Sequence, residues 1–137
     1  MSLQIDRALL GQEFDRAVIG PVTAEEILEY IAATEECEAS AVAADLVAPP
    51  TFVVRARVNL YKLPTLGEIQ MGFDAGKDIE FGVPIRPGDV LASVGTVHDI
   101  YEKTGRSGTM SFIVLRTVVT NQRGELVAVV DQQMMYR

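Results

Sequence analysis

Residues 47–63 read VAPPTFVVRARVNLYKL, and the structure of this stretch decides the fold of the whole chain. From Val54 to Leu60, apolar and polar residues alternate, which is the period of a β-strand. Phe52, Ala56 and Leu60 also lie on one stripe at helical spacing, which is the period of an α-helix. Periodicity alone therefore leaves both strand and helix open.

Prolines at both ends of the stretch favour the helix. Pro49 and Pro50 suit a helix start, where a missing N–H costs little. Pro64 suits a helix end, because proline cannot continue the hydrogen-bond ladder. Long extended segments follow, and a sheet of such strands needs a helix to wrap around. We therefore predict a helix over residues 50–63.

The C-terminal half of the chain has a strand pattern. Residues 78–85 alternate between apolar residues and charged or turn-forming ones, and three longer extended runs follow between residues 89 and 136. Turn-forming residues predict reversals at 86–89, 103–106 and 121–124. Strands of about a dozen residues exceed the usual length of roughly 5–6. The predicted fold class is α+β, with a long antiparallel sheet wrapped around a central helix.

A second helix is predicted over residues 23–36. Thr23 and Glu26 have the spacing of a capping box, in which each side chain bonds the backbone N–H of the other residue. Val22 precedes them, where it could pack on the first turn as a hydrophobic staple. The apolar face of this helix should cover the sheet, and it comprises Ile27, Tyr30, Ile31 and Thr34.

Composition limits the function classes. The chain has 137 residues, 48% of them hydrophobic and 23% charged, which predicts one globular domain over residues 1–137. A net charge of −7 argues against nucleic-acid binding. One cysteine, Cys37, and one histidine, His98, argue against a metal site. No apolar run is long enough to cross a membrane, no signal peptide is indicated, and the expected location is cytoplasmic.

Three motifs carry a resemblance to a known family. They are APPTF within residues 47–52, DIEFGVPIRPGD at 78–89 and VTNQRGEL at 119–126. In this order, and over about residues 9–136, the chain resembles the MaoC-like dehydratases. More narrowly it resembles the FAS1-type group, the N-terminal half of MaoC-type dehydratases and the non-catalytic subunit of mycobacterial-type (3R)-hydroxyacyl-carrier-protein dehydratase.

The resemblance implies a hotdog fold and a reaction. The reaction is the reversible hydration of a trans-2-enoyl thioester to a (3R)-hydroxyacyl thioester, with acyl-CoA or acyl-carrier protein as substrate and no cofactor. Active members place an Asp and a His after the first helix, in a Gly-Asp-x-Asn-Pro-x-His type of motif. The matching residues 33–40 read ATEECEAS and hold no Asp, no Asn-Pro and no His. The resemblance therefore implies a subunit that completes a hotdog dimer, either with itself or with a partner that supplies the Asp and His.

Candidate site residues follow from these motifs. Glu36, Glu38 and His98 are weak catalytic candidates, because a raised carboxyl pKa or a neutral imidazole could serve acid–base chemistry. The expected acyl-binding residues surround the start of the 50–63 helix and comprise Val47, Ala48, Thr51, Phe52, Val53, Ala56 and Leu60. Arg55, Arg57 and Lys62 could bind the phosphates of a CoA or phosphopantetheine arm. Equally, they could pair with the many carboxylates of the protein itself.

Two other functions remain open. The first is a hotdog acyl-CoA thioesterase, although no Asp or Glu occurs from Leu46 to Gly67, where such enzymes commonly place a carboxylate. The second is a non-catalytic module that binds acyl thioesters. In all three cases the expected ligand is an acyl thioester, and the expected assembly is a homodimer or a heterodimer.

Overall fold

The computed structural model describes residues 7–34, 46–56, 58 and 72–136. Its main element is one antiparallel sheet of five strands in the order β1-β3-β4-β5-β2. The strands are β1 (Glu13–Ile19), β2 (Gly72–Phe81), β3 (Leu91–Gly105), β4 (Gly108–Thr120) and β5 (Leu126–Tyr136). A short 3₁₀ helix, η1 (Arg7–Leu9), precedes β1.

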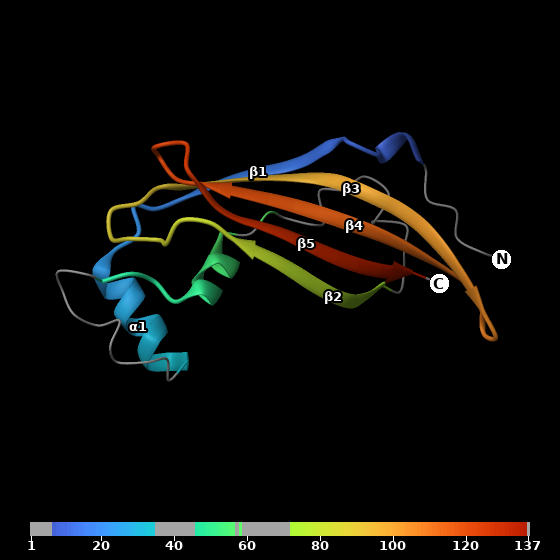
Figure 1. Ribbon diagram of the computed structural model, residues 1–137, viewed down its shortest axis with the longest axis horizontal. Coiled ribbons are helices and arrows are strands. Elements are labelled where there is room, and N and C mark those ends of the chain that lie inside the picture. Colours follow the sequence, from blue (N-terminus) through green and yellow to red (C-terminus); the bar gives the residue numbers. More distant parts are fainter. Residues whose placement is uncertain (1–6, 35–45, 57, 59–71, 137) are drawn as a thin grey trace.

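Two helical elements lie together near one end of the sheet. The helix α1 (Ala24–Thr34) and the 3₁₀ helix η3 (Pro50–Arg55) connect β1 to the rest of the chain. Figure 1 shows the sheet bowing over η3, with α1 beyond it on the same side. Five antiparallel strands curved over a helical segment form the hotdog fold, as the motifs predicted.

The structure changes the prediction for the stretch that decides the fold. Pro50–Arg55 is helical, but of the 3₁₀ type, with i→i+3 hydrogen bonds from Phe52 N–H to Pro49 O (2.9 Å) and from Ala56 N–H to Val53 O (3.0 Å). Adjacent β-branched valines at 53 and 54 weaken α-helix propensity. Residues 57 and 59–63 lie outside the described part of the chain.

The helix predicted over 23–36 is confirmed as α1, up to the last described residue. The Glu26 N–H donates to Thr23 Oγ1 at 3.0 Å, which is one half of the predicted capping box. Ile27 and Ile31 are buried as predicted, whereas Thr34 is exposed and its hydroxyl donates to Tyr30 O at 2.8 Å. Thr34 therefore does not belong to the packed face.

Strand bounds differ from the predictions at the sheet edge. The strand predicted over 78–85 is β2, which begins at Gly72 and ends at Phe81. The chain then bends, because Pro84 has no N–H to continue a ladder. The strand β1 was not predicted; it is an edge strand of seven residues whose side chains are exposed or half-buried. Such a strand lacks the apolar alternation that reveals buried strands.

Two groups of buried side chains fill the concave side of the sheet. One gathers around η3 and α1 and includes Ile27, Phe52, Leu91 and Val119. The other lies further along the strands and includes Leu9, Val97, Ile113 and Tyr136. Ala56, which directly follows η3, is tied to the sheet because Ser93 Oγ on β3 donates to Ala56 O at 2.8 Å.

Candidate functional site

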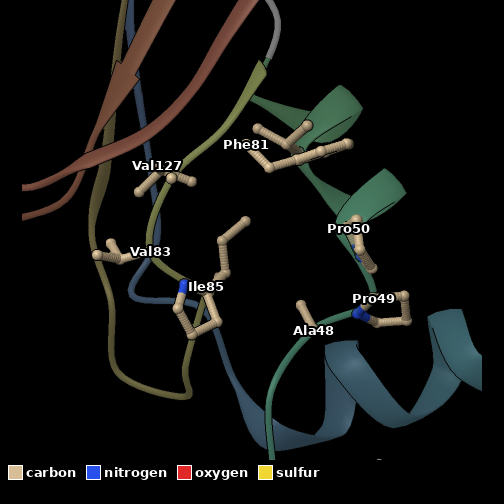
Figure 2. A pocket seen from close by; sticks show the side chains of 10 residues that line it. Ala48, Pro49, Pro50, Phe81, Val83, Ile85 and Val127 are labelled. Atoms are coloured by element: carbon tan, nitrogen blue, oxygen red, sulfur yellow. The ribbon is translucent and has the colours of Figure 1, made fainter. Parts of the chain in front are cut away.

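A small apolar cavity lies beside the start of η3. It has a volume of about 140 Å³, and every side chain from the described residues on its wall is apolar. Figure 2 shows Ala48, Pro49 and Pro50 on one side and Val83 and Val127 on the other. Such a wall suits hydrocarbon, because it offers no side-chain polar group that a chain of CH₂ units would leave unpaired.

Backbone hydrogen bonds fix the walls of this first cavity. The Ala48 N–H donates to Ile85 O at 2.8 Å, which ties the segment before η3 to the segment after β2. The Gly82 N–H donates to Val127 O at 2.8 Å, which holds that second segment against β5. A Cβ at Gly82 would lie 2.1 Å from Leu126 O, so the close approach requires glycine.

A larger cavity lies further along η3. It has a volume of about 290 Å³ and opens between the 53–58 segment and strands β2, β4 and β5. Val53, Ala56 and Val130 give it apolar walls, and a polar group of side chains shares it: Asp74, Lys77, Thr117 and Gln132. Among the described residues, Val53 alone lines both cavities.

The polar group is centred on the Asp74 carboxylate. Its Oδ1 accepts the Gly76 N–H at 3.0 Å, where β2 has a bulge. Its Oδ2 lies 3.4 Å from Gln132 Nε2 and 4.0 Å from Lys77 Nζ. These residues come from β2 and β5, which pair side by side in the sheet.

The helix α1 holds η3 in place from the outer side. Tyr30 Oη donates to Thr51 Oγ1 at 2.7 Å, and the Tyr30 ring meets the Phe52 ring edge-on at 5.3 Å between centroids. The Arg55 guanidinium lies over the Phe52 ring, 5.2 Å from its centroid, and 3.9 Å from the Glu26 carboxylate. Thr51 and Phe52 thus contact α1, and Arg55 lies beside a carboxylate of its own chain.

The remaining acyl-binding candidates have different positions. Ala48 and Val53 line the small cavity, and Val53 and Ala56 line the larger one. Val47 is half-buried. The Ala48 N–H is already used by Ile85 O. The catalytic candidates Glu36 and Glu38 and the candidates Arg57, Leu60 and Lys62 lie outside the described residues.

His98 lies away from both cavities. It is exposed and occupies the bulge where the β3–β4 register shifts between Val97 and Asp99. The bidentate hydrogen bond from the Arg116 guanidinium holds the pKa of Asp131 below its usual range, and the charge of His98 adds a smaller effect in the same direction. His98 therefore neighbours a structural ion pair on the sheet.

The described residues hold neither a metal-binding cluster nor a membrane-spanning helix. No three His, Cys, Asp or Glu side chains gather there as a metal site requires. In the same part of the chain, no helix has the length and apolar character needed to cross a bilayer.

Sequence reasoning missed the polar group of the larger cavity. A signal was present in β5, where Gln132 interrupts a face otherwise occupied by Ala128, Val130 and Met134. A lone amide on such a face indicates a polar contact. Asp74 and Lys77 gave no comparable signal, because charged side chains are usual on an edge strand.

Comparison with known proteins identifies the family. Residues 8–130 match the family described as FAS1-like, dehydratase domain region. The chain belongs to this family. It is thereby one of the MaoC-like hotdog proteins that its motifs indicated.

Solved structures agree with this assignment. The C-terminally truncated HadBC (3R-hydroxyacyl-ACP dehydratase) complex from Mycobacterium tuberculosis is 25% identical, with a TM-score of 0.71, and the match covers 97% of this chain and 99% of that chain. The MaoC-like dehydratase from Rhodospirillum rubrum is 22% identical (TM-score 0.67, covering 93% and 91%). The ChsH1–ChsH2 complex from Mycobacterium tuberculosis is 17% identical (TM-score 0.69, covering 88% and 82%). Curated protein sequences offer no match.

Proposed function

We propose that this chain is a subunit of a (3R)-hydroxyacyl-thioester dehydratase, or enoyl-thioester hydratase, and that it binds the acyl chain. A hotdog partner would supply the Asp and His. The observation that carries the proposal is the family match over residues 8–130 in a chain whose residues 33–40 lack the Asp and His of active members.

The division of labour follows from the chemistry. Dehydration needs a base for the α-proton, an acid for the departing hydroxyl and hydrogen-bond donors for the thioester oxygen. The described residues around the apolar cavity offer hydrocarbon contacts and no acid or base. The HadBC structure is a complex, which supports a partner for a chain of this family.

The first test separates acyl binding from catalysis. We expect the purified chain to bind octanoyl-CoA and to leave 2-octenoyl-CoA unhydrated, because residues 33–40 lack the Asp and His of active members. Addition of a hotdog chain with the Asp-x-Asn-Pro-x-His pattern should restore hydration. Full hydratase activity of the lone chain would contradict the partner role, and release of free thiol would identify a thioesterase instead.

A matched pair of substitutions tests the cavity. Val83→Trp should fill the 140 Å³ space and weaken octanoyl-CoA binding by roughly tenfold or more, because the bulky ring takes the volume of the ligand. Val18→Trp is the control, since Val18 is 70% exposed on β1. Equal affinity of both variants in isothermal titration would place the acyl group elsewhere.

A further inference from the structure

Hydrocarbon binding does not account for the polar side chains that line the larger cavity. The wall of the 140 Å³ cavity has apolar side chains, whereas the 290 Å³ cavity has four polar ones. Two of them, Thr117 on β4 and Gln132 on β5, lie beside Val130 on the part of the sheet that forms the floor of this cavity. A plain acyl chain would displace water from both side chains and return no hydrogen bond.

The amide of Gln132 has poor acceptors in the described residues. Its Nε2 lies 3.4 Å from Asp74 Oδ2, near the limit of a hydrogen bond, and 3.2 Å from the thioether sulfur of Met134. A thioether is a weak acceptor. A ligand oxygen placed over the floor would be a better acceptor for this N–H group.

The other polar residues mark the open edge. The side chains of Asp74 and Lys77 are 51% and 41% exposed. They can stay hydrated when a ligand binds, so the cost of desolvation falls on Thr117 and Gln132. These two side chains therefore determine which ligand fits.

Val53 lies between the apolar cavity and the polar cavity. Its buried side chain borders the apolar cavity on one side and the polar cavity on the other. An acyl group that passes Val53 would have hydrocarbon surroundings first and a hydrogen-bonding floor beyond. The polar atom of such an acyl group would therefore lie at the end that is distant from the apolar cavity.

We propose that the larger cavity binds the distal part of an acyl group that carries a hydroxyl or keto oxygen, with Gln132 and Thr117 as its hydrogen-bond partners. This inference rests on the proposed function, because it names the substrate class of the same acyl site. It assigns specificity to two residues that neither the motifs nor the family match distinguish.

The experiment compares ligands of equal length. Hexanoyl-, octanoyl- and decanoyl-CoA are each titrated into the full chain beside their terminally hydroxylated counterparts. We expect one hydroxylated ligand to bind about tenfold more tightly than its plain counterpart, the gain typical of one added hydrogen bond that spares a buried polar group. The two proposed hydrogen-bond partners, Gln132 and Thr117, both belong to this chain, so the lone chain should show the preference.

Substitutions then assign the preference to the floor. Gln132→Leu and, independently, Thr117→Val should remove the preference while leaving affinity for the plain ligand equal or higher. Gln133→Leu is the matched control, because the neighbouring Gln133 points to the opposite face of the sheet and lines neither cavity. It should keep the wild-type preference.

The possible results distinguish a failure of this inference from a failure of the proposed function. Equal affinity for plain and hydroxylated ligands in the wild type overturns this inference and leaves the acyl-binding role standing. An equal loss of CoA and acyl-CoA affinity in Gln132→Leu means that the pantetheine arm occupies the cavity, which also overturns it. Failure of the wild type to bind any acyl-CoA overturns the proposed function together with the inference.

Discussion

At the scale of single residues, burial changes the chemistry of one tyrosine most clearly. Tyr136 is 3% exposed and packs at the end of β5 with Leu9 and Ile113. Burial disfavours the charged phenolate and raises the pKa of Tyr136 to about 12. The unfolded chain ionises its tyrosines at about pH 10, so the folded state binds this proton more tightly.

The stability of the protein should therefore fall in alkali. Because the folded pKa is the higher one, the contribution of Tyr136 is fully present below about pH 10 and is lost as the pH rises to about 12. The loss amounts to as much as about 3 kcal/mol. Urea unfolding over this pH range should give a steeper decline for wild type than for Tyr136→Phe. Parallel declines would contradict the raised pKa.

At the scale of elements, η3 depends on its neighbours. A six-residue 3₁₀ helix is too short to be stable alone. Phe52 anchors it: the side chain is 1% exposed, meets the Tyr30 ring edge-on and lies beneath Arg55. The position of η3, and with it both cavities, follows from this contact with α1.

Removal of the anchor should be costly. Phe52→Ala should lower the free energy of unfolding by about 3–5 kcal/mol, because it deletes a buried ring and leaves a cavity. Phe73→Ala is the matched control; Phe73 is 45% exposed on β2, and its loss should cost well under half as much. Similar losses in chemical denaturation would show that η3 does not depend on Phe52.

At the scale of the whole molecule, Asp89 joins segments that are far apart in sequence. The side chain is buried; its Oδ2 accepts the Arg86 N–H at 2.9 Å and its Oδ1 accepts Gln122 Nε2 at 2.9 Å. Its backbone carbonyl accepts the Val22 N–H at 2.8 Å, next to the start of α1. Asp89 ends the reversal predicted at 86–89, and the structure adds that its side chain connects this turn to the 121–124 turn at the same end of the sheet.

Substitution of Asp89 should reveal these connections. Asp89→Ala leaves the Arg86 N–H and the Gln122 amide without acceptors and should cost about 2–4 kcal/mol of unfolding free energy. Asp89→Asn keeps one acceptor oxygen and should cost less. Asp78→Ala on the edge strand β2 is the exposed control and should change little. Denaturant midpoints that rank otherwise would contradict the role of Asp89.

Local patterns predicted much of the fold. The capping residue Thr23 located α1, and Gly124, with a φ of 75°, takes the left-handed position expected in the 121–124 turn. The long C-terminal strands lie within the predicted extended runs between residues 89 and 136, although β3 continues to Gly105, through the reversal predicted at 103–106. The strand β1 was missed, because an exposed edge strand carries little apolar alternation.

The sequence by itself determined the long C-terminal strands, the turns at 86–89 and 121–124 and α1, because these depend on neighbours within a few residues. Only the tertiary structure decided which side chains share a cavity. Asp74 and Gln132 are separated by 58 positions, yet they meet because β2 pairs with β5 at the edge of the sheet. Val53 divides the two cavities for a similar reason: its position is set by contacts of η3 with α1 and the sheet, and no local pattern encodes such contacts.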